Sequence, residues 1–264
     1  MNLKSDHRRK LDWAKQHFAG YNDSVKRFME SRPYEMHGKH DTRSGKYVGR
    51  LARVDPVPDD WSLRIADAVH CIRSSLDVLV YQLAVKHRGK KGIAAAELLK
   101  LGFVMATDAD DFERLSADQL QPLSDEMRVA MHGIQTYRIT NPRHHNGLLV
   151  LRSFSNLDKH RLIVPTLAAA KGARIEAQVE GESKPRVLGT YDGPINVGVR
   201  VLNTDTRLIS SLQKQKATFN ASLGLVVHFE NTRPAFGGAV EEFLQKTIQY
   251  CERDAFPVLE AFLN

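Results

Sequence analysis

Hydrophobic residues recur with the period of an α-helix through most of the first 170 positions. The pattern predicts a first helix over residues 6–29, with Gly20 as a break. The longest periodic stretch runs from Asp59 to His87, and its apolar residues fall on one face. We expect Asp59 or Asp60 to cap this helix. Gly89 should follow its last turn, because glycine is favoured just beyond a helix end.

Three shorter helical patterns follow, over residues 93–101, 116–132 and 148–170. Ser116 and Gln119 have the spacing of a capping box at the start of the second. Pro165 is expected to bend or end the third, because proline cannot donate the helical hydrogen bond. The Gly- and Pro-containing segment 31–58 is predicted to be a linker with one short strand at 46–54.

The period changes to that of β-strands between residues 174 and 231, where apolar and polar residues alternate. A last helical pattern covers residues 239–263, with a kink at Pro257. The predicted class is α+β: a helical bundle with an inserted antiparallel sheet of about four strands and a returning C-terminal helix. The predicted parts are an N-terminal helix (1–30), the linker (31–58), a helical body (59–170 and 239–264) and the β insertion (174–231).

The composition, with 42% hydrophobic and 26% charged residues, is that of a globular protein with a packed core. The formal charge of +7 is a modest excess, which fits either an ordinary basic protein or one with an anionic partner such as nucleic acid. Cys71 and Cys251 lie in helical apolar patterns and are expected to be reduced. No targeting or membrane-spanning pattern is found, so we expect a soluble, cytoplasmic protein.

Polar side chains form one stripe along the helix predicted at 59–87. On a helical wheel, His70, Arg73 and Asp77 lie on a different side from the apolar face. A histidine near a carboxylate can serve acid–base chemistry. The same stripe is also compatible with a solvated face in which Arg73 and Asp77 form an ordinary i,i+4 ion pair.

A second polar segment, residues 152–161, lies between two apolar runs. On a regular helix Asn156 and His160 share a side, whereas Asp158 points almost opposite to His160. Burying such a segment without partners would be costly, so we interpret it as a second part of a site or as a structural clasp. The first segment could also hold a metal, whereas Asp158 and His160 could not bind one ion from a regular helix. No nucleotide-binding or hydrolase motif is found, so no metal ligand or cofactor is assigned.

The two polar segments resemble paired motifs in a family of bacterial and phage-associated proteins. The residues that carry the resemblance are H-x-x-R-x-x-L-D at 70–77 and N-x-D-K-H-R at 156–161. This resemblance implies a defence or mobile-element context and no particular activity. The Arg64–His70 spacing is similar to the signature of the HEPN superfamily of helical bundles, some of which cut RNA. Such Arg–His pairs occur in the chain about as often as chance predicts, so the spacing alone does not indicate a nuclease.

Three functions remain open from the sequence. The first is a binding or regulatory module for nucleic acid, with contacts from a basic helix end and from the second motif: Lys86, Arg88, Lys90, Lys91, Asp158, Lys159 and Arg161. The second is an enzyme, a metal-independent HEPN-like ribonuclease or a metal-dependent hydrolase, with the catalytic set His70, Arg73, Asp77, Asn156 and His160. The third is a structural protein, with both motifs as buried clasps. Monomeric and homo-oligomeric states are both open.

Overall fold

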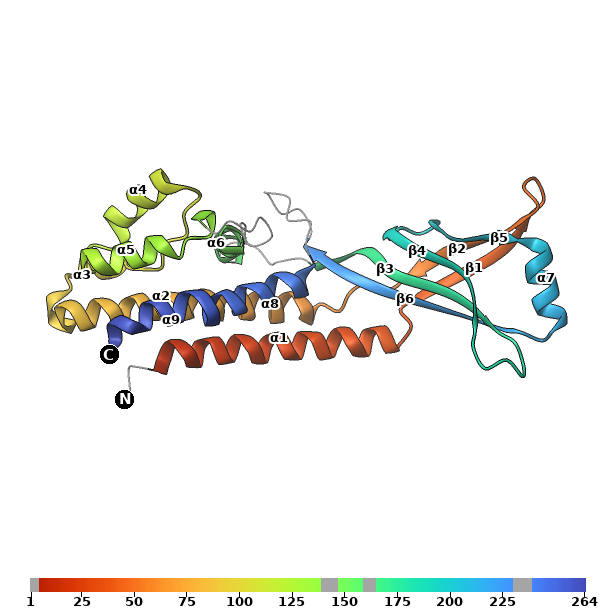
Figure 1. The fold of residues 1–264 in the computed structure, drawn as a ribbon, viewed down its shortest axis with the longest axis horizontal. Coiled ribbons are helices and arrows are strands. Elements are labelled where there is room, and N and C mark those ends of the chain that lie inside the picture. Colours follow the sequence, from red (N-terminus) through yellow and green to blue (C-terminus); the bar gives the residue numbers. More distant parts are fainter. Residues whose placement is uncertain (1–4, 139–146, 159–164, 230–238) are drawn as a thin grey trace. The chain divides into compact units, whose positions relative to one another are not determined.

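The computed structural model describes residues 5–138, 147–158, 165–229 and 239–264, with the backbone alone at 156–158, 165–173, 223–225 and 228–229. The chain forms two compact units. The first, or helical unit, comprises Met1–Asn22, Asp59–Val164 and Phe229–Asn264. The second, or β unit, comprises Asp23–Pro58 and Pro165–His228. The α+β class is confirmed (Figure 1). The strands belong to the β unit and most helices to the helical unit.

Helix α1 (Asp6–Glu30) confirms the first predicted helix but runs through Gly20 without a break. The absence of a side chain at Gly20 has a packing reason. A Cβ atom there would lie 2.7 Å from Nη1 at the flexible end of the Arg64 side chain, so α1 and α2 approach closely at this position. At the next residue, the rings of Tyr21 and Trp61 pack edge to face with their centroids 5.6 Å apart. The break predicted from glycine's low helix propensity is therefore overridden by contact with α2.

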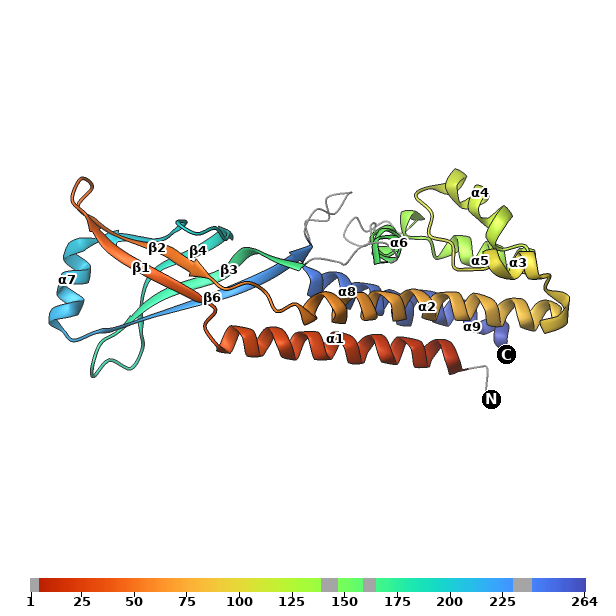
Figure 2. The ribbon, with the colours of Figure 1, turned by 180° about the vertical axis from the view of Figure 1, so that it is seen from behind.

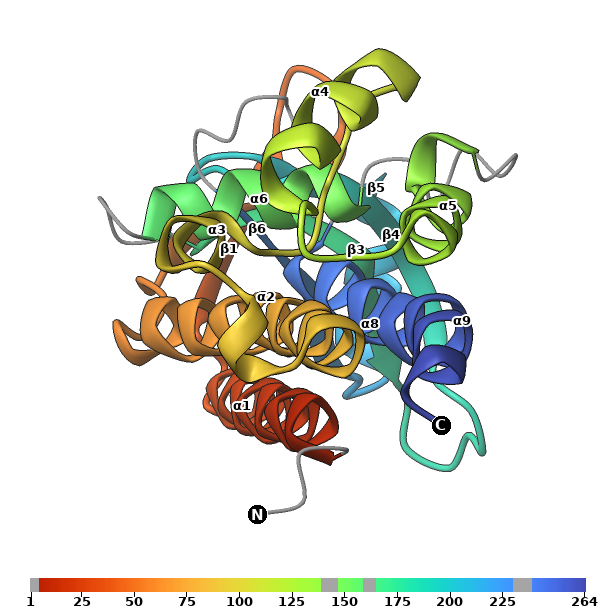
Figure 3. The same ribbon diagram turned by 90° about the vertical axis from the view of Figure 1, so that its left-hand side faces the viewer.

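Helix α2 (Asp60–Arg88) is the centre of the helical unit and matches its predicted bounds. Figure 3 shows it between α1 and the helices α6 and α8. Gly89 has φ 72° and donates its N–H to the carbonyl of Val85, as expected just beyond a helix end. The prediction that Asp59 or Asp60 caps the helix is wrong, because Asp59 has helical backbone angles and makes no capping bond, and Asp60 accepts from Arg64 instead.

Two helices replace the single one predicted over 116–132: α4 (Ala109–Gln119) and α5 (Asp125–Gly133). Asp108 caps α4 by accepting from the Asp111 N–H, and Ser124 caps α5 by accepting from the Met127 N–H. Ser116 is buried inside α4 and is not a cap. Short helical segments flank this pair, at α3 (Ala95–Lys100) and in 3₁₀ turns at Lys90–Gly92 and Thr136–Arg138.

Helix α6 covers Gly147–Asp158, and the helix predicted to reach residue 170 is wrong in its second half. Residues from Pro165 onward form strand β3 (Pro165–Gln178). The run of alanines at 168–170 favours a helix by propensity, but pairing with β4 decides the structure.

The C-terminal residues form α8 (Val240–Tyr250), a π-helical turn at Cys251–Ala255, α9 (Phe256–Glu260) and a 3₁₀ turn at Ala261–Leu263. The kink predicted at Pro257 takes the form of this π turn. The wider turn accommodates a residue that has no N–H and whose ring would clash with the preceding turn of a regular helix.

The β unit contains two antiparallel three-stranded sheets, in place of one sheet of about four strands (Figure 2). The first has the order β1-β2-β5, with β1 at Tyr34–Asp41, β2 at Lys46–Val54 and β5 at Arg200–Asp205. The second has the order β4-β3-β6, with β4 at Arg186–Pro194 and β6 at Thr218–Phe229. Helix α7 (Thr206–Lys214) connects β5 to β6. The segment predicted to be a linker is therefore mostly a β-hairpin, and only its second strand was expected.

Side chains from both sheets form the core of the β unit. Ile175 of the second sheet packs with Val201 and Leu202 of the first, and Met36 and Tyr47 pack against them. Leu212 of α7 joins Ala177 and Val179 in a neighbouring cluster. Among the described residues, no helix is both long and apolar enough to cross a bilayer.

Candidate functional site

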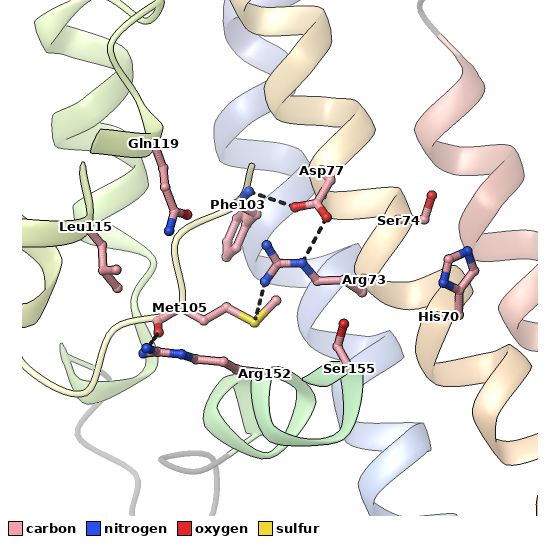
Figure 4. Close-up of a pocket in the computed structure, with 10 residues that line it drawn as sticks. All are labelled: His70, Arg73, Ser74, Asp77, Phe103, Met105, Leu115, Gln119, Arg152 and Ser155. Carbon is pink, nitrogen blue, oxygen red and sulfur yellow. Dashed lines mark hydrogen bonds and ion pairs between the residues drawn. The ribbon is translucent and has the colours of Figure 1, made fainter. Parts of the chain in front are cut away.

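A pocket of about 480 Å³ opens in the helical unit beside the predicted polar stripe (Figure 4). Helix α2 forms one wall, α6 another, and the extended segment 102–106 and α4 complete it. The residues that line it are His70, Arg73, Ser74, Asp77, Phe103, Met105, Leu115, Gln119, Arg152 and Ser155. The structure therefore places the polar stripe of α2 at a pocket. His70 is exposed, and Arg73 and Asp77 form the i,i+4 pair expected for a solvated face.

Asp77 joins α2 to the extended segment. Its Oδ2 accepts from Nε of Arg73 at 2.9 Å, and its Oδ1 accepts from the backbone N–H of Phe103 at 2.8 Å. Gly102 lies directly against this pair, since a Cβ atom there would be 3.1 Å from Oδ1 of Asp77. Both carboxylate oxygens thus hold partners within the fold, so Asp77 orients Arg73 and anchors the pocket wall.

Arg152 reaches the same wall from α6. Its Nη1 donates to the carbonyl of Met105 at 3.0 Å and to Oδ2 of Asp111 at 3.2 Å. Burial alone would raise the pKa of Asp111. The Thr107 N–H and the Arg114 and Arg152 guanidiniums outweigh that effect and lower the pKa below its ordinary value. Asp111 therefore stays ionised and holds Arg152 in place.

The two guanidiniums converge on Met105. Arg73 donates from Nη1 to Sδ of Met105 at 3.1 Å, while Arg152 binds the carbonyl of the same residue. Figure 4 shows both guanidinium groups beside this residue, with Ser155 nearby. The lining carries two arginines and one carboxylate, and each arginine is ion-paired, Arg73 with Asp77 and Arg152 with Asp111.

His70 is exposed at the rim of the pocket. Among the described residues it has no hydrogen-bond partner, and none of them form a group of three or more His, Cys, Asp or Glu able to hold a metal ion. A catalytic histidine is usually oriented by a carboxylate or carbonyl. The described part of the pocket offers no such partner.

The structure brings together three of the five residues of the predicted catalytic set, His70, Arg73 and Asp77. Asn156 lies in α6, one residue after Ser155, but only its backbone is described. His160 lies outside the described residues, as do Lys159 and Arg161, and only the backbone of Asp158 is described. The expectation that these residues complete the site remains a prediction.

The basic helix end is exposed but is partly engaged in the fold. Arg88 donates to Oε1 of Glu97 at 2.8 Å and to the backbone carbonyl of Gln121. Lys86, Lys90 and Lys91 are exposed. Arg88 therefore connects the end of α2 to α3 and to the turn after α4.

Sequence reasoning missed Arg152, Ser155, Gln119 and the apolar wall of Phe103, Met105 and Leu115. A signal existed for two of them. Arg152 and Ser155 lie in the second polar segment at i,i+3 spacing, so one face of a helix must carry both. The apolar wall had no comparable signal, because segment 102–106 reads as ordinary core.

Comparisons with protein-family models, with curated protein sequences and with solved structures found no match for this chain.

Proposed function

We propose that this chain is a binding protein for a phosphate-bearing ligand, a nucleotide taken either free or as part of single-stranded nucleic acid. The observation that carries the proposal is the convergence of Arg73 and Arg152, from different helices, on one pocket. Each guanidinium has five N–H groups, and the described contacts use two on each side chain. The remaining N–H groups are suited to the planar, bidentate recognition of phosphate oxygens.

The rest of the lining fits the other parts of a nucleotide. Of the apolar lining residues, Leu115 is partly exposed and can contact a base, whereas Phe103 and Met105 are 0% and 2% exposed. Ser74, Ser155 and Gln119 offer hydroxyl and amide groups. A volume of about 480 Å³ falls within the range of small-molecule sites. The pairing of Arg73 with Asp77 and of Arg152 with Asp111 pre-organises the donors, so ordering them on binding costs little.

Binding is favoured over catalysis by the engagement of the titratable groups. Asp77 accepts a hydrogen bond on each oxygen, and His70 has no described group to orient it. An enzyme would have to draw its catalytic groups from Asn156, His160 or the ligand. The clasp hypothesis explains Asp77, but it gives no reason for a second arginine on the same pocket wall. The defence or mobile-element context belongs to this proposal through the motif resemblance alone.

The proposal is tested by calorimetric titration of the full chain with inorganic phosphate, AMP and a short single-stranded RNA at low salt. We expect AMP to bind more tightly than phosphate, because it also contacts the apolar wall. Tighter binding of the RNA than of AMP, with a steep loss in higher salt, would identify nucleic acid as the source of the phosphate. Absence of binding by all three up to millimolar concentrations would refute the proposal.

Variants locate the site. Arg152→Lys keeps the charge but loses the planar, bidentate donor geometry of the guanidinium, and should weaken AMP binding roughly tenfold. Arg64→Lys is the matched control, because Arg64 pairs with Asp60 at i,i+4 on α2 and does not line the pocket. His70→Ala removes an exposed rim residue and should weaken binding without lowering Tm. Equal losses in Arg152→Lys and Arg64→Lys would show that the effect is not specific to the pocket.

A further inference from the structure

The β unit has a pocket of its own, of about 360 Å³. It lies between the inner face of the β1-β2-β5 sheet, strands of the second sheet and α7. Three aromatic side chains line it: Tyr34 of β1, Tyr47 of β2 and Phe219 of β6. Phe219 is 40% exposed, so part of its ring is open to solvent.

Two of these aromatic walls are held by the fold. The Tyr34 hydroxyl donates to the backbone carbonyl of Ala221 at 3.1 Å and so connects the two sheets. Tyr47 lies against the backbone at Gly38, where a Cβ atom would come within 2.3 Å of the tyrosine hydroxyl oxygen. Any side chain at position 38 would displace the ring. The pocket is therefore built from positioned rings, which reduces the cost of ordering them around a ligand.

Arg32 supplies a cation to this pocket at a strained backbone position. It follows the end of α1 with φ 54°, in the left-handed region that favours glycine. Gly45, Gly89, Gly181 and Gly198 occupy other left-handed positions of the described chain, and Arg32 and Lys216 are the exceptions there. Among the described residues, the Arg32 side chain has no hydrogen-bond or ion-pair partner. Of these two residues, Arg32 lines the pocket and Lys216 does not, so the cation available to a ligand there is that of Arg32.

We propose that this second pocket binds a small aromatic anion. The planar apolar part packs on Tyr34, Tyr47 and Phe219, and the anionic group pairs with Arg32. Gln213 and Asn220 add amide groups to the lining. The site is separate from the pocket at His70, and the inference does not depend on the proposed function.

Two fluorescent probes test this chemistry. 8-Anilinonaphthalene-1-sulfonate (ANS) has an aromatic body and an anionic group, whereas N-phenyl-1-naphthylamine has the same body without the charge. The native chain should bind the sulfonate with roughly tenfold higher affinity, the size of one charge-assisted contact. Phe219→Ala, at an exposed ring, should weaken binding of both probes. Equal affinity for the two probes would overturn the proposal.

Arg32→Gly is the most informative variant, because it should raise Tm while it removes the preference for the sulfonate. Relief of the left-handed strain should raise Tm by about 2–4 °C. Loss of the cation should abolish the preference for the sulfonate. Lys216→Gly is the matched control: it has the same φ of 54° but does not line the pocket, so it should raise Tm and leave probe binding unchanged.

Three results would overturn the proposal. The first is a preference for the sulfonate that survives Arg32→Gly. The second is an equal loss of that preference in Lys216→Gly. The third is a loss of that preference in Arg152→Lys while Arg32→Gly keeps it, which would place the probe in the pocket of the helical unit.

Discussion

Replacing Asp77 by alanine should destabilise the helical unit far more than replacing another acid on the same helix. Asp77 makes two interactions, one with the Phe103 N–H and one with Nε of Arg73. Its side chain is 35% exposed and that of Arg73 is 22% exposed, so both are partly shielded from water. The variant would leave the Phe103 N–H and the Arg73 guanidinium without this partner.

The magnitude follows from the two interactions. A hydrogen bond from a backbone N–H to a charged group contributes about 1.5–3 kcal/mol. An i,i+4 ion pair with this exposure adds less than about 1 kcal/mol. The expected loss is therefore about 2–3 kcal/mol, or a fall in Tm of about 5–10 °C for a chain of this size. Asp77→Asn keeps an acceptor oxygen and should lose about half as much.

Urea unfolding followed by circular dichroism measures this loss. Asp60→Ala is the matched control, because Asp60 pairs with Arg64 at the same spacing on α2, has a 46% exposed side chain and bonds no backbone group outside the helix. It should cost less than about 0.5 kcal/mol. Equal losses for Asp77→Ala and Asp60→Ala would refute the assignment of Asp77 as the anchor of the pocket wall.

Three further outcomes follow from buried and partly buried groups. Burial would raise the pKa of Glu260, but hydrogen bonds from Arg8 and His7 lower it below the ordinary 4.5. The free energy of unfolding of the native chain should therefore exceed that of Glu260→Gln by its maximum amount above pH 4.5, and this difference should vanish as the pH falls through the lowered pKa. Urea unfolding measures both, and a difference that stays constant down to about pH 3 would contradict this. Gln135 is fully buried, and its amide forms hydrogen bonds with three backbone groups. Gln135→Ala should therefore lower the free energy of unfolding by about 2–4 kcal/mol. A loss below about 1 kcal/mol would show that these backbone groups find other partners. Burial raises the pKa of the Cys251 thiol, so mass spectrometry should find it unalkylated by iodoacetamide in the folded chain, and rapid modification would contradict its burial.

Local patterns predicted the elements in which one face stays apolar along the whole length and packs against the core. Helix α2 was predicted almost to the residue because its core face persists for eight turns and Gly89 marks its end. Strand β1 was missed because it carries only two apolar residues, Tyr34 and Met36, and has no buried side chain; its pairing with β2 defines it. The error at 165–170 has the same origin, since strand pairing overrides the helix propensity of alanine.

The site was predicted in part for a similar reason. Helical spacing placed His70, Arg73 and Asp77 on one stripe, because residues on one helix have fixed relative positions. Arg152 and Met105 enter the pocket from separate segments, and the sequence carries no spacing rule between segments. The function of Asp77 as acceptor for the Phe103 N–H is likewise visible only in three dimensions.

The central claim is that Arg73 and Arg152 together bind a phosphate group, and calorimetric titration of AMP into the native chain and Arg152→Lys tests it most directly. The account predicts saturable, one-site binding by the native chain and affinity lower by roughly tenfold in Arg152→Lys. Arg64→Lys should bind as the native chain does. Identical isotherms for the native chain and Arg152→Lys, or no saturable binding of AMP, would contradict the claim.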